Sequence, residues 1–358
     1  MASTGLNFAA LTPDNGAIRD LKGLILLRML DPDTLGKLFT VLPNQRDGAK
    51  VGIVGEFGLV GQAAQGCSPT YNSSAISTAE KTWDIAEWGV YEQICYEDLK
   101  GTLAQVAFSQ KTSVGDLTAS QYMDEVVAPR LLLAIRKMLL RFAFFGDTAA
   151  ALESAGGVLK AGVNPSYFNL TDGYWKQILS GVTSGSIGRT TFAANAQTTF
   201  ATQKSTIAGK GVATGYLNSL IEDAPLALRQ AENQRIYITL ALKDALDADI
   251  RANNVGSDLQ WESIFGGIKR AEYNGIELVV VPFMDEIIKG YEGDGKAWNN
   301  PYRAIYTTKD NLLVGLGSED EIAELKVWFD DKEDLNYIKA KDSVGFIVAS
   351  DDLVQVGF

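Results

Sequence analysis

Histidine is missing from all 358 residues of the sequence. Its absence removes the most common general base near neutral pH, the catalytic triads that depend on it and the commonest zinc ligand. The two cysteines, Cys67 and Cys95, are too few for a paired-ligand zinc site or a disulfide framework. Most familiar enzyme chemistry is therefore excluded, and we expect no catalytic residue, no cofactor and no metal site.

A long apolar run and a secretory leader are also absent. The most apolar stretch, Leu131 to Phe145, is interrupted by the basic residues Arg136, Lys137 and Arg141. A membrane-spanning helix needs about 20 predominantly apolar residues. No N-terminal stretch has the basic, apolar and cleavage-site order of a signal peptide. We therefore expect a protein made in the cytoplasm, with no membrane span.

Basic residues are fewer than acidic residues. The sequence has 32 Lys and Arg against 44 Asp and Glu, a net charge of −12. Tight nucleic-acid binding depends on Lys and Arg that displace counterions from phosphates, so this balance argues against a nucleic-acid reader. The negative net charge is compatible with a protein that encloses nucleic acid without binding it tightly. Much of the excess falls in residues 319–352, which we interpret as a solvated strand face.

The 46% of hydrophobic residues can build a sizeable core of one or two domains. Apolar residues at helical spacing predict a long helix over 118–145, kinked or divided at Pro129 and stopped at Gly146 by a left-handed conformation. Further helices are predicted at 212–231 and 240–252, and strands at 235–239, 276–281, 324–329 and 344–348. Because helices and strands mix without a regular βαβ alternation, the predicted class is α+β.

Two segments look unable to fold by themselves. The N-terminal stretch is polar up to residue 15 and then predicts an amphipathic helix to Asp31, followed by a small helix to Phe39. Residues 48–66 carry six glycines among β-formers, which predicts a long pliable hairpin whose return limb is the strand around Lys81 to Cys95. Segments that bury few of their own apolar groups imply a partner surface.

Residues 149–211 are rich in Gly, Ala, Ser and Thr. Such a composition buries little apolar area. We therefore expect this segment to be an exposed insertion.

Few local motifs suggest chemistry. Gly290, Gly295 and Lys296 match the spacing of a phosphate-binding loop, but Ala297 stands where the magnesium-binding hydroxyl belongs, so an acidic surface turn is favoured. Asp244, Asp247 and Asp249 fit the polar face of a helix. A second group offers the oxygen ligands of a calcium site: Asp330, Asp331, Glu333 and Asp334. The second group lacks the central glycine of a dedicated calcium loop.

Three tryptophans invite two interpretations. Trp83 and Trp88 on the predicted return limb, and Trp298 beside an Asn-Asn-Pro turn, could anchor an interface because aromatic residues dominate binding hot spots. Packing in the core explains them equally well.

The order of the elements resembles the major capsid proteins of tailed bacteriophages, which share the Hong Kong 97-type fold. Three strings carry the likeness: RFAFFGDT (Arg141 to Thr148), YNGIELVVVPFM (Tyr273 to Met284) and DSVGFIVASDDLVQVGF (Asp342 to Phe358). They resemble the end of the family's spine helix, its Gly-strand-Pro segment and its C-terminal strand pair. Together they cover nearly the whole chain.

The resemblance implies a division of the chain. Residues 1–47 correspond to an N-terminal arm and 48–82 to the extended E-loop hairpin. The peripheral domain with its long spine helix takes 83–148 and 319–341. The axial domain takes 149–318 and 342–358, including the insertion of about 149–211.

The implied function is a structural one. Copies of the chain would form pentamers and hexamers of an icosahedral virion shell around phage double-stranded DNA, assembled in the host bacterial cytoplasm. The implied partners are other copies, a portal, a separate scaffolding protein and, as an optional addition, decoration proteins, with only weak non-specific contact to DNA. No lysine lies between Val51 and Glu80, so we expect no isopeptide cross-link from the hairpin. The arm helix begins within the first twenty residues, so we expect no scaffolding segment in this chain.

Two other functions remain open at this point. Bacterial encapsulin shells have a similar fold and enclose enzymes instead of genomes. A carboxylate-dependent hydrolase needs no histidine, although nothing in the sequence singles out a pair of acids.

Overall fold

The computed structural model describes residues 36–57, 76–95, 128–207, 211–253, 260–265, 268–317, 324–330 and 335–358. Its helices are α4 (Ala128–Phe145), α5 (Tyr174–Ser184), α6 (Phe200–Ile207), α7 (Val212–Glu222), α8 (Leu226–Gln230), α9 (Leu240–Asn253) and α10 (Pro282–Tyr291). Its strands are β1 (Thr40–Leu42), β2 (Lys50–Phe57), β3 (Ile76–Thr82), β4 (Ala86–Cys95), β5 (Gly188–Thr190), β6 (Gln234–Ile238), β7 (Glu262–Phe265), β8 (Ile268–Tyr273), β9 (Ile276–Val280), β10 (Ala304–Thr308), β11 (Leu312–Leu316), β12 (Glu324–Asp330), β13 (Leu335–Val348) and β14 (Val354–Gly357).

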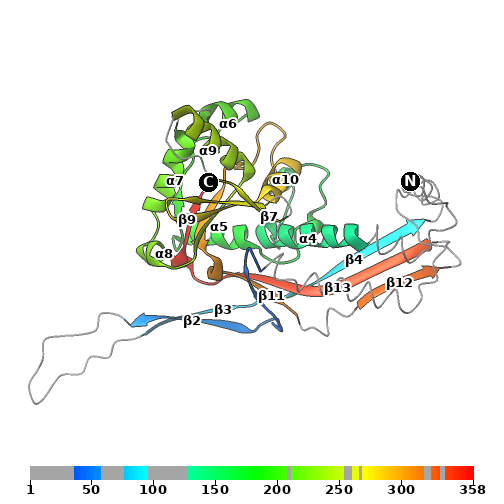
Figure 1. Ribbon diagram of the computed structural model, residues 1–358. Helices are drawn as coiled ribbons and strands as arrows, with labels where there is room; N and C mark the ends of the chain where they lie inside the picture. The colour runs from blue at the N-terminus through cyan, green and yellow to red at the C-terminus, as the bar shows by residue number, and fades with distance from the viewer. Residues whose placement is uncertain are drawn as a thin grey trace, which may run out of the picture.

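A mixed seven-stranded sheet forms the centre of the body, in the order β5-β14-β10-β6-β9-β8-β7. Its middle strands are apolar on both faces because helices cover both faces (Figure 1). Side chains alternate along β6, so Ile236 and Ile238 pack with α7 and α9, while Tyr237 packs with α4, α5 and α10. The predicted strands 235–239 and 276–281 and the helix 240–252 are confirmed within one residue at each end.

A second sheet leaves the body as a long ribbon. Its central strand β13 is 14 residues long. It pairs with β11 inside the body, and farther out with β12 on one side and β4 on the other. Helix α4 lies along the ribbon (Figure 1), and Ile135 and Leu139 of α4 share a core with Trp88 and Ala340 of the ribbon. This shared core joins the ribbon to the body.

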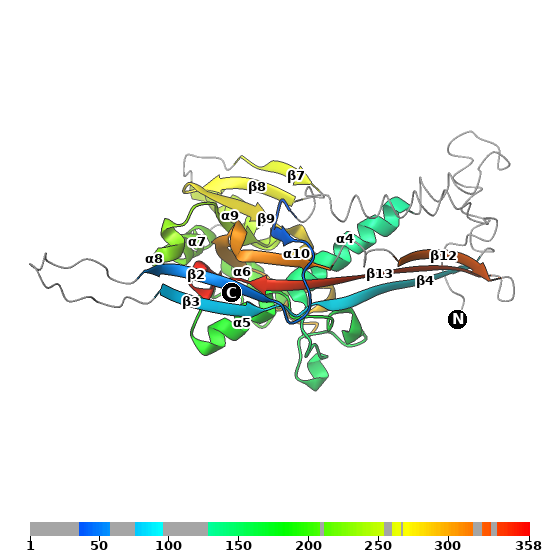
Figure 2. The same ribbon diagram turned by 90° about the horizontal axis from the view of Figure 1, so that it is seen from below.

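A two-stranded hairpin, β2 with β3, projects from the body in the direction opposite to the ribbon (Figure 2). The predicted return limb was wrong: β3 pairs with β2, while β4 pairs with β13. The two strands are separated because the chain turns at Trp83, whose buried side chain and backbone bonds to Gly48 and Ala49 fix the base of the hairpin. One predicted strand is therefore two strands in two sheets.

The prediction of an exposed insertion at 149–211 was also wrong. Phe168, Tyr174, Trp175, Ile178 and Ile187 are buried in the main core. Helix α5 carries three of these side chains on one face, so the small residues between them do not prevent burial. Aromatic residues at helical spacing were the signal that the composition obscured.

Proline bears on two of the predicted helices. The described part of α4 starts at Ala128, next to Pro129, so a kink or division of the longer helix at Pro129 stays a prediction. The helix predicted over 212–231 is two helices, because the chain turns at Pro225 between α7 and α8. Residues 118–127 and the arm helix predicted before Asp31 lie outside the described residues. Residues 36–39, expected to be helical, form a turn before β1.

Gly146 stops α4 as predicted, but for a different reason. Its backbone is not left-handed; instead, an added Cβ would lie 2.3 Å from the carbonyl oxygen of Thr171 and 2.6 Å from that of Phe142. Close approach of two backbone segments, and not backbone conformation, therefore requires glycine here.

Replacing Gly146 by alanine is expected to lower the free energy of unfolding by about 2–3 kcal/mol, because backbone must move to make room for the methyl group. Chemical denaturation of the purified protein measures this change. Gly215→Ala is the matched control, since Gly215 is exposed on α7 with nothing near its added Cβ. The free energy of unfolding of this control should rise by about 0.5–1 kcal/mol, because alanine has a higher helix propensity than glycine. Equal effects at both positions would contradict the packing argument.

Candidate functional site

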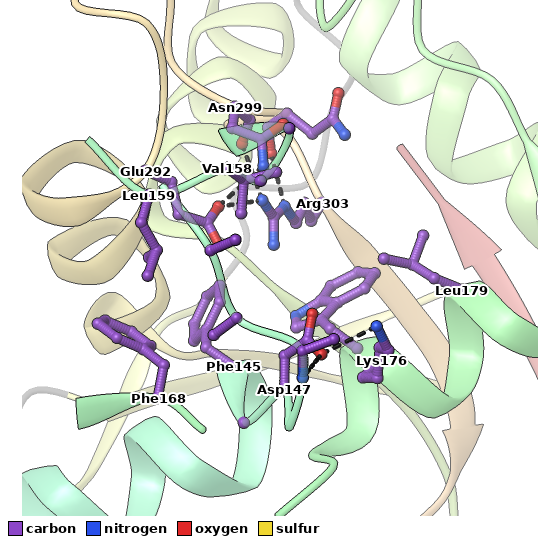
Figure 3. Close-up of a pocket in the computed structure, with 18 of the residues that line it drawn as sticks. Phe145, Asp147, Val158, Leu159, Phe168, Lys176, Leu179, Glu292, Asn299 and Arg303 are labelled. Atoms are coloured by element: carbon purple, nitrogen blue, oxygen red, sulfur yellow. Dashed lines mark hydrogen bonds and ion pairs between the residues drawn. The ribbon is translucent and has the colours of Figure 1, made fainter. Parts of the chain in front are cut away.

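A cavity of about 310 Å³ lies where the end of α4, the loop after it and α5 meet (Figure 3). Its walls are mostly apolar, with Phe145, Leu159, Phe168 and Leu179 among them. Four charged side chains also line it: Asp147, Lys176, Glu292 and Arg303. This composition makes the cavity the first place to look for binding or catalysis.

The charged residues of the cavity are paired with one another. Arg303 donates to Glu292 at 2.5 Å, and both side chains are almost fully buried. Glu292 also accepts from Asn299 Nδ2 at 3.1 Å. The Arg303 guanidinium lies 5.4 Å from the Phe145 ring centre and 5.2 Å from that of Trp175, so aromatic faces cover the cation. This pair joins the end of α10 to the segment that leads into β10.

The second pair lies near the cavity mouth, where Lys176 Nζ is 2.9 Å from Asp147. Each carboxylate of the cavity therefore has a cation, and the described lining residues include no nucleophile beside a general base. In a glycosidase-type pair, one carboxyl group stays protonated and the other ionises. A cation beside each carboxyl group would instead keep both of them ionised. The arrangement is that of structural ion pairs, and the hydrolase alternative gains no support from it.

The phosphate-loop lookalike is a surface turn, as favoured from the sequence. Gly293 and Gly295 have positive φ angles, and Asp294 Oδ1 accepts from the backbone N–H groups of Lys296 and Ala297 at 2.8 and 2.7 Å. These hydrogen bonds hold the pKa of Asp294 below its usual value. A carboxylate thus occupies the donors that a phosphate would need.

The three aspartates of α9 do not share one role. Asp244 is exposed, and Asp247 accepts from Lys243 and from the Trp261 indole. Asp249, predicted to lie on a polar face, is fully buried, and its Oδ2 accepts from the backbone N–H of Ala213 at 2.7 Å. It supplies an acceptor to the unpaired N–H groups at the start of α7, a contact between helices that sequence spacing does not reveal.

Core packing explains the tryptophans: Trp298 also packs against the main core, and its role as an interface anchor stays a prediction. Trp83 and Trp88 are buried, so core packing explains both. Trp298 is partly buried, with its ring 4.7 Å from that of Phe200 and 5.0 Å from Lys289 Nζ. The side chains of Cys67, Cys95 and residues 330–334 lie outside the described residues.

Within the described ranges, no group of three potential metal ligands comes together. Among those same residues, no helix is long and apolar enough to cross a membrane.

The base of the projecting hairpin is the other feature that the sequence did not reveal. Trp83 packs with Leu313 and Ile347 in a small core of its own. Beside it, Lys81 Nζ lies 2.5 Å from Asp351, and Ser186 Oγ donates to the same carboxylate at 2.7 Å. One small core and one ion pair therefore set the direction in which the hairpin leaves the body.

Acid is expected to loosen this attachment. Burial alone would raise the pKa of Asp351, but hydrogen bonds from Lys81 and Ser186 and the charge of Lys81 lower it below its ordinary value of 3.8. A carboxyl group whose pKa is lower in the folded state than in the unfolded state stabilises the fold at pH values above its unfolded-state pKa. This stabilisation is lost as the pH falls through the folded-state pKa. Hydrogen-exchange protection of the Trp83 amide, corrected for intrinsic rates, should be constant from about pH 5 to 7 and fall below about pH 4.

Asp351→Asn is the matched control for this prediction, because it keeps the shape and removes the titration. Its protection at the same amide should be lower at neutral pH and nearly independent of pH. An unchanged pH dependence in Asp351→Asn would show that another group controls the hairpin base.

No protein-family model and no curated protein matches the chain. Solved structures do match. A chain of the satellite phage P4 procapsid that includes the size determination protein is 11% identical, with a TM-score of 0.53, over 97% of this chain and 91% of that one. The Gordonia phage Cozz structure gives 10% identity and a TM-score of 0.50, covering 91% and 85% of the two chains. A chain of the native GTA particle capsid gives 13% identity and a TM-score of 0.50, covering 91% of this chain and 89% of that one.

Identities this low establish similarity of fold alone. The α+β class predicted from the sequence is confirmed, and the likeness extends over most of each matched chain. The protein therefore has the α+β fold of chains found in phage procapsid and GTA capsid structures.

Proposed function

We propose that the protein is the major capsid protein of a tailed phage. Its copies would form pentamers and hexamers of an icosahedral shell around double-stranded DNA. The observation that carries this proposal is the similarity to a phage procapsid chain over 97% of the sequence, because it includes the extended parts as well as the body. No described cluster of side chains favours catalysis instead.

We assign the parts as the sequence resemblance implies. Residues 1–47 are the N-terminal arm, and 48–82 are the E-loop, which contains β2 and β3. The peripheral domain takes 83–148 and 319–341, with α4 as the spine helix beneath the ribbon of β4, β12 and β13. The axial domain takes 149–318 and 342–358. The boundary near residue 341 falls inside the continuous strand β13, so movement of one domain would carry the other with it.

Assembly follows from what the extensions lack. An isolated two-stranded hairpin is marginally stable in water, and β2 with β3 is such a hairpin beyond its anchored base. The ribbon exposes Tyr91, whose side chain is 65% accessible, on the face of β4 that α4 does not cover. Lying across neighbouring copies would bury these surfaces, and cyclic symmetry would repeat each contact around a ring.

The remaining partners follow from the same role. A shell of this kind requires a portal and a scaffolding protein, here a separate one, and it accommodates decoration proteins. The net charge of −12 keeps contact with packaged DNA weak and non-specific. Residues 51–80 contain no lysine, so the shell is not welded by an isopeptide bond from the hairpin. Assembly takes place in the host bacterial cytoplasm and ends in the virion.

Expression in bacteria with the neighbouring genes, followed by sedimentation and negative-stain microscopy, tests the proposal. Closed icosahedral particles with DNA inside, and a single band on denaturing electrophoresis, are the expected result. Particles that enclose an enzyme and no DNA would favour the encapsulin alternative. A compact monomer under all conditions would overturn the proposal, and covalent ladders would overturn the absence of cross-links.

A further inference from the structure

Exposed hydrophobic side chains gather at one place on the body. Of the six large ones that are exposed in the described part of the chain, four surround the cavity: Val158, Tyr167, Leu179 and Tyr291. Val158 and Leu179 line the cavity itself. The Tyr291 ring is 6.0 Å from that of Phe168, which is another wall of the cavity and the next residue after Tyr167. Exposed apolar groups that cluster in this way mark interaction sites more often than scattered ones do.

Arg141, near the end of α4, lies within this patch. Its Nε donates to the carbonyl oxygen of Tyr167 at 2.9 Å, and its guanidinium carbon lies 5.7 Å from the ring centres of both Tyr167 and Phe168. Among the described residues, no carboxylate forms an ion pair with it. Arg235, Arg270 and Arg303, in contrast, each contact a glutamate. Within the described part of the chain, the Arg141 charge therefore contacts only a carbonyl group and aromatic rings.

Partial burial makes this lack of a carboxylate costly. Burial lowers the pKa of Arg141, while the neighbouring Tyr291 and Tyr167 side chains act in the opposite direction. A guanidinium that has lost part of its water gains most from a planar anion that accepts two of its N–H groups. The two Nη atoms make no hydrogen bond within the described ranges, so both remain available for such an acceptor.

We propose that Arg141, Tyr167 and Tyr291, which lie around the buried Phe168 ring, form a docking surface for a carboxylate-bearing segment of a second copy of this chain. We call these three residues the Arg141 surface. Arginine and tyrosine are enriched at the energetic centres of interfaces, and here the carbonyl and ring of Tyr167 hold the guanidinium in place beside an apolar cavity. A carboxylate would pair with the guanidinium, and its neighbouring side chain would cover the tyrosine rings.

Charge balance identifies the second copy as the source of the carboxylate. Each chain carries 44 acidic residues against 32 basic ones, so every copy brings unpaired carboxylates to an assembly. A nucleic acid would supply phosphates, but Lys137, the cation one turn before Arg141 on α4, is already paired with Glu286 at 2.9 Å and is not free to extend a phosphate-binding track. The inference rests on the proposed function, because it requires copies that assemble.

Chemical cross-linking tests the contact directly. Arg141→Lys places a primary amine on the Arg141 surface, and a carbodiimide joins it to a carboxylate only if the two are in contact. Particles are assembled from an equal mixture of ¹⁴N- and ¹⁵N-labelled subunits, and cross-linked peptides are read by mass spectrometry. The expected result is a peptide that joins position 141 to an Asp or Glu with mixed labels, present in particles and absent from dissociated subunits.

Arg141→Gln provides the energetic test. The subunit concentration needed for assembly should rise about tenfold or more, the effect of losing about 1.4 kcal/mol at a docking contact. Arg251→Gln is the matched control, because Arg251 is exposed and its one hydrogen bond to the described residues goes to a backbone carbonyl of its own helix. Its assembly threshold should change less than twofold.

The outcomes separate this inference from the proposed function. Wild-type chains that never assemble overturn both. Particles in which position 141 gives no mixed-label link, or links only within one chain, overturn the Arg141 surface alone. In a parallel sample treated with formaldehyde, which bridges a lysine amine to a base amino group with loss of water, a DNA cross-link at this position without a protein link would also overturn it, because the partner would then be nucleic acid.

Discussion

Replacing Glu292 by leucine is expected to lower the free energy of unfolding by about 3–5 kcal/mol, the largest single-residue effect that the described contacts support. Glu292 and Arg303 are both almost fully buried, so removal of the carboxylate leaves a guanidinium without its counter-charge in a site of low polarity. Asn299 Nδ2 loses its acceptor as well. Urea denaturation of the unassembled subunit measures the change.

Two variants make this result specific. Glu80→Leu removes a carboxylate from the exposed ion pair of Glu80 with Lys50, in which the two side chains are 61% and 64% accessible. This change should lower the free energy of unfolding by less than about 1 kcal/mol. Glu292→Leu combined with Arg303→Met should recover much of the lost stability, because the unpaired charge is gone. A Glu292→Leu subunit as stable as the wild type would show that the pair is not sealed from water.

Removal of the projecting hairpin should abolish assembly and leave the body intact. Gly52 and Glu80 are register partners, so a two-residue Asn-Gly turn between them replaces residues 53–79 and keeps the anchored base. Trp83 and its small core remain, so we expect the free energy of unfolding to change by less than about 1 kcal/mol. Sedimentation should find no particles, because the proposed contact of the hairpin with neighbouring copies is lost.

A second variant separates the hairpin's structure from its length. A Gly/Ser linker of equal length in place of residues 53–79 keeps the chain connected but supplies few apolar groups to bury. It too should remain a folded subunit that does not assemble. Normal particles from either variant would mean that the hairpin has no part in the contacts between copies.

The sequence predicted best where a residue's partners are close by in the chain or where both faces of a strand are buried. Ile276 and the run from Leu278 to Val280 are apolar because helices cover both faces of their sheet, and this strand was placed correctly. The long helix was also located, since the apolar face of 128–145 repeats at helical spacing. Local pattern was sufficient in both cases.

Contacts between distant segments could not be predicted in this way. Trp83 separates β3 from β4 because its side chain packs against Leu313 and Ile347, more than 200 residues away. Gly146 is required by the approach of Thr171, and Arg303 is matched to Glu292 only after α10 and β10 are in place. The resemblance to phage capsid proteins gave the α+β fold, whereas these pairings depend on the packed structure.

A cryo-electron microscopy map of the assembled particle, at a resolution that traces side chains, tests the central claim most directly. The account predicts that the β2–β3 hairpin of each copy lies on another copy, with its base still held by Trp83 and by the Lys81–Asp351 pair. A map in which every hairpin folds back onto its own body, with no contact to a neighbouring copy, would contradict it.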